Sequence, residues 1–350
     1  MKVFHLSFHL GCIRSINALM RDLGHELEYM YARPEIPYAI TSGVADTIWE
    51  KYGAKWNTYD LILTSDTAAL SYIFLRHLGE LKPKLLIWVC NRFDYSMGDV
   101  PEYYELLRKV THGREWVNKV KVVPYTEYER IHCGKHKIWV REPVLLPYGK
   151  VEGTKVFNGQ VDSEKPLELD TSGMTAPKDE TVFVSFYNNE SNFLPIKDIL
   201  KSQGISVVGG EFRCIEDLKG YKAIVTLPDA FSKFFYFELL NIQLPIFIPT
   251  EEFFMELNPL YRPNGKGDYY KYCFTIDNNV VPPYYIDMCE WYKYPNERLF
   301  FESLDDLIQK LRSFTKEDGA MIRRRQKANA EFHNAQVLAT AKKILADFEN

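Results

Sequence analysis

The sequence predicts an α/β protein made of two doubly wound domains that face one another across a central cleft. The chain has 350 residues, which is more than twice the ~150 residues of a typical domain. Strand-like and helix-like segments alternate in its first half, as they do in parallel sheets that are covered by helices on both faces. After a polar stretch rich in glycine and proline, the alternation restarts at Thr181. Because such sheets bind ligands beyond the carboxyl ends of their strands, two ligand-binding edges are expected to line the cleft.

The first domain is expected at residues 1–150. An apolar stripe between Gly11 and Gly24 indicates a helix that glycine ends, and Asp66 is positioned to cap a second helix that runs to Leu78. A capping box, Thr126-x-x-Glu129, opens a later helix, and another is expected near 101–112. Strands are expected at 2–8, 26–32, 59–64, 84–89, 119–123 and 137–140.

The second domain is expected at residues 179–316, after a linker at 151–178 where periodicity fails. A Tyr-, Pro- and Asn-rich insertion occupies 258–298, and a last helix covers roughly 317–348. The remaining elements are strands at 181–186, 205–208, 223–227 and 246–248 and helices at 193–202, 232–241 and 303–314.

Composition excludes several classes of protein. The net charge of −4 gives no reason to expect a nucleic-acid partner, which favours a basic surface. The sequence contains neither a run of ~18 apolar residues nor the apolar stretch of a signal peptide. Its six cysteines are scattered and form no cluster at zinc-ligand spacing. We therefore expect a cytoplasmic protein with reduced thiols, no integral membrane segment and no bound metal.

The most informative segment runs from Pro228 to Thr250. Its pattern is strand end, loop, helix start, helix and strand. The free N–H groups around Phe231, Ser232 and Lys233 suit a phosphate, and Lys233 adds a full positive charge. Glu238 follows about one and a half turns later, within reach of a ribose hydroxyl pair; the alternative is an amphipathic helix in which serine only caps and the glutamate is solvated.

This segment resembles the "E-A-x-A-x-G-x-P-V-I" segment of nucleotide-sugar glycosyltransferases of the GT-B fold, with Glu238 followed by Pro245. Residues 145–151 (LLPYGKV) are similar to the crossing into that family's second Rossmann-like domain, and residues 217–223 (DLKGYKA) to its "L-x-x-Y-x-x-A". The resemblance implies that Glu238 binds the donor ribose and that the loop before it holds the diphosphate. It also implies a C-terminal helix, 317–350, that returns toward the first domain, and a reaction without bound metal or other cofactor.

Departures from the family pattern favour inverting chemistry. Retaining members carry a glutamate eight positions before the ribose glutamate, where this chain has Ala230. The strand at 181–186 is followed by YNNES instead of the family's phosphate-clamping Gly-Arg. Ser185, Asn188 and Asn189 are then candidates to hydrogen-bond the donor.

An inverting transfer needs one general base to deprotonate the acceptor hydroxyl. His9, at the end of the first strand, resembles in position the catalytic histidine of inverting members, where an aspartate orients the imidazole. Asp94 and Asp66 are the candidates for that aspartate, and Asp94 is our choice if an aspartate acts alone. As alternatives, Asp66 is only a helix cap and His9 a polar loop residue. Gly11, Arg14 and Arg92 lie nearby in the sequence, where the arginines can meet the diphosphate or an anionic acceptor.

The sequence therefore predicts transfer of a hexosyl or pentosyl group from a nucleotide-diphosphate sugar to a hydroxyl of a glycan or small-molecule acceptor. Two other functions stay open: an epimerase of nucleotide sugars, and a two-lobed sugar-binding protein. The tyrosines and tryptophan of 258–298 are either a stacking platform for an acceptor glycan or packing of a long loop.

Overall fold

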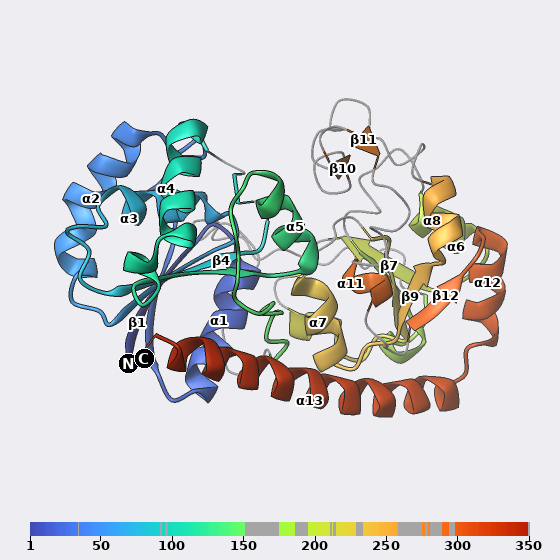
Figure 1. Cartoon of the computed structure of the whole chain (residues 1–350). Coiled ribbons are helices and arrows are strands. Elements are labelled where there is room, and N and C mark those ends of the chain that lie inside the picture. The colour runs from blue at the N-terminus through green and yellow to red at the C-terminus, as the bar shows by residue number, and fades with distance from the viewer. Residues whose placement is uncertain are drawn as a thin grey trace. The chain divides into compact units, whose positions relative to one another are not determined.

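The computed structural model divides the chain into two compact units (Figure 1). Unit 1 comprises Met1–Val156 and His333–Asn350, and unit 2 comprises Phe157–Phe332. The structure describes residues 1–33, 35–91, 93–94, 97–150, 175–185, 195–210, 212, 215–228, 234–257, 275–276, 279–280, 289–293 and 298–348. The expected linker at 151–178 lies mostly outside these residues, as does most of the insertion at 258–298.

Unit 1 is built on a five-stranded sheet in the order β2-β1-β3-β4-β5, with all four neighbouring pairs parallel. Apolar side chains fill both faces of the central strands, so Leu61 to Ser65 are all buried, as is typical of parallel sheets covered on both faces. The strands are β1 (Lys2–Ser7), β2 (Glu26–Tyr31), β3 (Leu61–Ser65), β4 (Lys84–Val89) and β5 (Val120–Pro124).

Helices cover both faces of this sheet. In Figure 1, α2, α3 and α4 lie on one side and α1 on the other. Aromatic residues dominate the first side, where Trp56 contacts Phe4, Trp49 and Phe74, so part of the aromatic excess of the sequence is core. The helices are α1 (Leu10–Asp22), α2 (Ser42–Trp56), α3 (Tyr72–Arg76), α4 (Val100–His112) and α5 (Glu127–Lys135), with short 3-10 turns η1 (Ala68–Ser71) and η2 (Arg114–Trp116).

Two expectations for unit 1 need correction, and one helix was missed. Asp66 caps no helix, because Thr67 holds the N-cap position of η1 and the chain beyond β3 forms η1 and the short α3 instead of one helix to Leu78. Residues 137–140 form no strand, and Lys137 has a left-handed backbone with φ 60°. The helix α2 was not expected from the sequence. By contrast, Thr126 is confirmed as the N-cap of α5, since its hydroxyl accepts the Glu129 N–H at 3.3 Å.

Unit 2 is also built on a five-stranded parallel sheet, with the same strand order as unit 1. Its sheet has the order β12-β9-β8-β6-β7, again with parallel neighbours. Numbered along the chain, both sheets read 2-1-3-4-5. The strands are β6 (Val182–Ser185), β7 (Val207–Gly210), β8 (Ala223–Val225), β9 (Ile246–Pro249) and β12 (Arg298–Phe301), and a short antiparallel pair joins β10 (Thr275–Ile276) to β11 (Asn279–Val280).

The helices of unit 2 include one, α7, that is mostly aromatic and aliphatic and carries a single buried charged residue, Glu238. The others are α6 (Ile196–Ser202), α7 itself (Phe234–Asn241), α8 (Glu251–Leu257), α11 (Glu290–Lys293) and α12 (Leu304–Ser313), with 3-10 turns η3 (Lys178–Glu180) and η5 (Ile215–Leu218). The predicted class, α/β with two doubly wound parallel sheets, is therefore confirmed by the strand order of both units.

The long C-terminal helix α13 (Lys316–Ala346) belongs to both units. Within unit 2, Gln326 donates to the Leu244 carbonyl at 2.9 Å. Within unit 1, His333 donates to the Pro147 carbonyl at 2.7 Å and Asn334 accepts the Gly149 N–H at 2.9 Å. The boundary between the units thus falls inside one continuous helix.

Two further observations concern helices and thiols. None of the helices in the described parts of the chain has the length and apolarity needed to cross a bilayer. The four cysteines within those parts, Cys12, Cys90, Cys133 and Cys289, are buried and form no disulfide bond.

Candidate active site

The first sheet places its ligand edge between β1 and β3. In a sheet ordered 2-1-3-4-5, consecutive connections leave in opposite directions from the first and third strands, and ligands bind at this switch point beyond the carboxyl ends. Ser7 and Ser65 are paired across these two strands, and the Ser65 hydroxyl donates to Ser7 Oγ at 3.0 Å. His9 follows β1 and Asp66 follows β3, so the topology brings these two predicted residues to the same edge of the sheet.

A series of buried, hydrogen-bonded polar side chains supports the loop after β1. His5 Nε2 lies 2.7 Å from Ser65 Oγ, and Ser7 Oγ accepts the His9 N–H at 3.1 Å. Complete burial lowers the pKa of His5 to about 3, so its imidazole is neutral. The hydroxyls of Ser7 and Ser65 each have a hydrogen-bond partner. Because buried polar groups are costly without partners, this series of side chains fixes the backbone that presents His9.

His9 begins helix α1. Its backbone is extended and its Nδ1 accepts the Cys12 N–H at 3.3 Å, which makes it the N-cap. The side chain is exposed. Gly11 and Arg14 lie on the first turns of α1 and are both buried, Arg14 with 6% of its surface exposed. A buried guanidinium therefore lies on the helix that starts at the switch point.

Asp66 has an unusual backbone and an unusual carboxyl group. Its φ of 72° is left-handed, a conformation that is strained for most non-glycine residues. Its carbonyl accepts the N–H groups of Cys90 and Asn91 at 3.2 and 2.9 Å, which ties it to the end of β4. Burial raises the pKa of its carboxyl to about 7, although the charge of Arg33 and the N–H of Thr67 oppose the rise.

Other titratable groups face this carboxyl. The Asp66 charge contributes to the raised pKa of Tyr31, on β2, and of Cys90, at the end of β4. Burial is the larger cause in both cases, and Cys90 also contacts the thiol of Cys12 on α1. The surroundings of Asp66 are thus mostly neutral, with Arg33 as the opposing cation, which explains why desolvation dominates its pKa.

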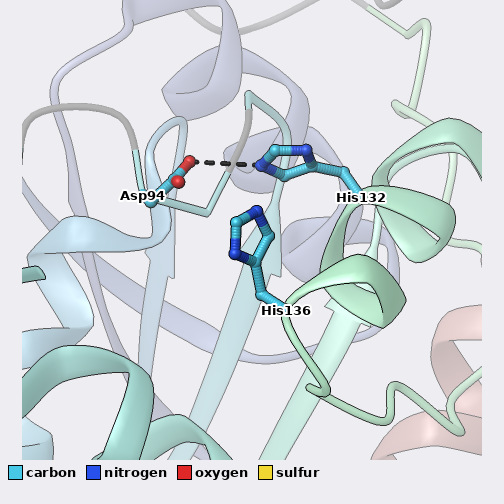
Figure 2. Close-up of side chains that lie close together, drawn as sticks. All are labelled: Asp94, His132 and His136. Atoms are coloured by element: carbon cyan, nitrogen blue, oxygen red, sulfur yellow. Dashed lines mark hydrogen bonds and ion pairs between the residues drawn. The ribbon is translucent and has the colours of Figure 1, made fainter. Parts of the chain in front are cut away.

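Asp94 lies at the same edge, beyond β4, but takes part in a different cluster. His132 Nε2 is 3.3 Å from Asp94 Oδ1, and the Tyr104 hydroxyl donates to Oδ2 at 2.6 Å. His136, at the end of α5, completes the cluster (Figure 2). Burial would raise the pKa of Asp94, but hydrogen bonds from His132 and Tyr104 and the charge of His132 outweigh it and lower the pKa to about 2.

Sequence reasoning missed His132 and His136. Their spacing of four residues puts both on one face of a helix, and this was the available signal. Asp94 lies 38 residues before His132, so its contribution depends on how β4 and α5 pack. No local pattern reports that contact.

The second sheet repeats the switch-point arrangement with the predicted donor residue Ser185. Ser185 ends β6, and its hydroxyl lies 3.0 Å from the Thr226 hydroxyl beyond β8. This is the position in the 2-1-3-4-5 order that Ser7 and Ser65 occupy in unit 1. Glu238 lies on α7 and is buried, with 4% of its surface exposed. The other predicted site residues lie outside the described residues: Asn188, Asn189, Phe231, Ser232, Lys233 and Arg92.

A hollow of about 590 Å³ in unit 2 lies at the opposite, amino-terminal edge of the sheet. Three cationic side chains that line this hollow donate hydrogen bonds to backbone carbonyls of the same unit. Lys222 donates to the Leu311 carbonyl at 2.8 Å, Arg323 to that of Tyr221 at 3.1 Å and Arg312 to that of Gln203 at 2.9 Å. These side chains bind carbonyls at the ends of helices and loops, and the hollow lies at the edge opposite to the switch point. We therefore do not include the hollow in the candidate site.

Comparisons with known proteins give structural likeness only. No protein-family model matches the sequence, and neither does any curated protein. Among solved structures, T4 phage BGT in complex with UDP and Mn²⁺ aligns over all of both chains at 8% identity and a TM-score of 0.49. The DNA-modifying enzyme β-glucosyltransferase aligns over all of both chains at 9% and 0.45. A putative UDP-N-acetylglucosamine 2-epimerase from Listeria monocytogenes aligns over 86% of this chain and 99% of its own at 11% and 0.40. Likeness at this level assigns no substrate and no residue role.

Proposed function

We propose that the protein is an inverting glycosyltransferase that moves a sugar from a nucleotide-diphosphate donor to an acceptor hydroxyl. The observation that carries the proposal is the placement of Asp66: it follows the third strand at the switch point of the first sheet, with a carboxyl pKa of about 7. A general base works best when its pKa lies near the operating pH, because it is then partly deprotonated and still basic enough to take a proton.

Asp66 fits this role better than the other two candidates. Asp94 has a pKa of about 2, so it is a weak base at neutral pH. The Nδ1 of His9 accepts the Cys12 N–H, which leaves Nε2 carrying the proton in the neutral ring. His9 then donates a hydrogen bond instead of taking a proton, and its position at the start of α1 suits contact with the acceptor or the leaving phosphate.

The donor is assigned to unit 2 on two grounds. Ser185 and Thr226 mark the switch point of its sheet, where doubly wound domains bind nucleotides. Glu238 is a buried carboxylate on α7, in the position where the glycosyltransferase motif has its ribose-binding glutamate. A carboxylate accepts two hydrogen bonds and therefore matches the two hydroxyls of a ribose.

The reaction is a single displacement. The Asp66 carboxylate takes the proton from the acceptor hydroxyl while the acceptor oxygen forms a bond to the anomeric carbon. The bond from that carbon to the diphosphate oxygen breaks, and its electron pair leaves with the nucleoside diphosphate. Attack opposite the leaving group inverts the anomeric centre. We assign to Arg14, which is buried on α1, the stabilisation of the negative charge that develops on the diphosphate.

The test is incubation with a panel of nucleotide sugars, each with and without acceptors that include glycosides, oligosaccharides and duplex DNA. Acceptor-dependent release of nucleoside diphosphate, with the sugar found on the acceptor in the inverted configuration, is the expected result. An altered sugar still attached to its nucleotide shows an epimerase instead. Binding of a nucleotide sugar or free sugar without any conversion shows a binding protein. Either of these two outcomes contradicts the proposal.

A further inference from the structure

The side chains around Asp94 form a second potential site that the transfer reaction does not use. We propose that Asp94, His132 and His136 bind one divalent transition-metal ion of the Zn²⁺ class. The three residues each offer one ligand atom, and these atoms all lie within 4.8 Å of one another. Figure 2 shows the two imidazoles and the carboxylate directed toward a common point. This inference is independent of the proposed function.

The backbone holds the two histidines in place. His132 lies on the last turns of α5 and His136 is its C-cap, so their spacing of four residues puts them on one helix face. The His136 N–H donates to the Cys133 carbonyl at 3.0 Å, and the Lys137 N–H to that of Gly134 at 3.0 Å. The left-handed Lys137, φ 60°, then ends the helix. Both imidazoles are thus attached to a terminated, hydrogen-bonded turn and not to a free loop.

The distances suit a single ion. With metal–ligand bonds of ~2.0–2.1 Å, two ligands of a tetrahedral site lie about 3.3 Å apart. His132 Nε2 and Asp94 Oδ1 are 3.3 Å apart, so this pair already has the required separation. The centroids of the two imidazole rings are 5.0 Å apart at an interplanar angle of 61°, so the rings are neither stacked nor turned away from each other.

Outer groups orient the ligands, as they do in known metal sites. The Tyr104 hydroxyl donates to Asp94 Oδ2 at 2.6 Å, which leaves Oδ1 directed at His132. The Phe93 ring lies 5.3 Å from the imidazole of His132 and 5.5 Å from that of His136. The ring of Tyr104 meets His136 edge-on at 4.9 Å. The cluster therefore has an apolar wall and a hydrogen-bonded carboxylate.

Exposure leaves room for a further ligand. The side chain of Asp94 is 21% exposed and that of His132 is 11% exposed, so one side of the cluster reaches solvent. Three protein ligands with an open position are typical of metal sites that bind water or substrate, whereas purely structural zinc sites have four protein ligands. Two imidazoles and one carboxylate favour Zn²⁺ and its neighbours Co²⁺ and Fe²⁺ over Mg²⁺ or Ca²⁺, which prefer oxygen.

The test measures Zn²⁺ binding to tag-free protein that has been stripped of metal, by competition with a chromophoric chelator. Co²⁺ binding is followed separately by its visible absorption. We expect one equivalent of Zn²⁺, and a visible Co²⁺ spectrum of low coordination number. His132→Gln with His136→Gln should abolish both signals. Tyr104→Phe keeps every ligand and should weaken binding by about 10- to 100-fold, the usual effect of removing an outer hydrogen bond.

His112→Gln is the matched control, because His112 ends α4 outside the cluster and its loss should leave affinity unchanged. Far-UV circular dichroism checks that each variant is folded. Stoichiometric binding that survives in the double histidine variant, or absence of saturable binding in the folded wild-type protein, would overturn the inference. Equal weakening in His112→Gln would show adventitious binding to surface histidines and would overturn it as well.

Discussion

The Ser65 hydroxyl donates to the Ser7 hydroxyl at 3.0 Å across the carboxyl ends of β3 and β1. In unit 2 the hydroxyls of Ser185 and Thr226 are 3.0 Å apart at the corresponding place. Each pair joins the first and third strands of a sheet ordered 2-1-3-4-5, beneath the switch point where ligands bind. The two units therefore share this contact between two hydroxyl groups as well as a strand order. In unit 1, Asp66 directly follows Ser65 of this pair.

Removing the Ser65 hydroxyl should destabilise unit 1. Ser65→Ala leaves His5 Nε2 and the Ser7 hydroxyl without their shared partner in a fully buried place. An unsatisfied buried polar group costs about 1–3 kcal/mol, so we expect the free energy of unfolding to fall by that amount. Thr47→Ala, at an exposed hydroxyl of α2, should change it by less than about 0.5 kcal/mol.

Urea unfolding followed by tryptophan fluorescence measures this change, because five of the six tryptophans lie in unit 1: Trp49, Trp56, Trp88, Trp116 and Trp139. A Ser65→Ala variant as stable as the wild type would show that the buried series of polar side chains from His5 to His9 does not hold the edge of the sheet.

The carboxyl of Asp66 should make stability fall as the pH rises. Its pKa is about 7 in the folded protein against an ordinary 3.8, so the folded state keeps a proton that the unfolded state has released. The contribution is complete below pH ~4 and is lost as the pH rises through 7, with a slope of at most about 1.4 kcal/mol per pH unit. Asp66→Asn lacks this group and should gain stability relative to the wild type over that interval.

The measurement is urea unfolding of both proteins from pH 4 to pH 8. Taking the difference at each pH cancels groups that both proteins share, such as His5. A difference that stays constant with pH would mean that Asp66 ionises normally, and its assignment as a base tuned to neutral pH would then be wrong.

Glu238 should control donor affinity. Glu238→Gln preserves the size of the buried side chain but removes its charge, and hydrogen bonds to charged groups contribute about 1.5–3 kcal/mol. We expect the Kd for the nucleotide sugar to rise about 10- to 100-fold by calorimetry. Glu256→Gln, exposed on α8, is the control. Unchanged affinity in Glu238→Gln for every nucleotide sugar that the wild type binds would remove Glu238 from the donor site.

Much of the fold follows from local pattern, and the exceptions have physical causes. After Lys84, residues 85–89 are apolar without interruption, and Lys84–Val89 forms an interior strand as predicted. The missed α2 buries Ala45 and Gly53 beside two tryptophans, so its apolar face is built partly from small residues. A Cβ on Gly53 would lie 2.8 Å from the ring of Trp49, which explains a glycine that looks like a helix breaker. Lys137–Val140 has a strand-like composition but no strand partner among the described residues.

The candidate site, like the fold, could be predicted from the sequence only in part. His9 and Asp66 were predicted because each follows a strand, and the ends of parallel strands gather at one edge. The raised pKa of Asp66 results from burial of its carboxyl, which no local pattern reports. The neighbours of Asp94 come from α4 and α5, so its low pKa and its place among the two histidines depend on tertiary packing.

The role of Asp66 as general base is tested most directly by the pH dependence of sugar transfer by the wild type, by Asp66→Asn and by Asp60→Asn. Asp60 lies just before β3, at the opposite edge of the same strand, and serves as the matched control. We predict that wild-type kcat/KM rises about tenfold per pH unit below pH ~7 and then levels off. Asp66→Asn should lose about 10²- to 10⁴-fold in rate with donor affinity intact, and Asp60→Asn should behave as the wild type. Full activity in Asp66→Asn, or a wild-type profile that is flat between pH 5 and 8, would show that Asp66 is not the general base.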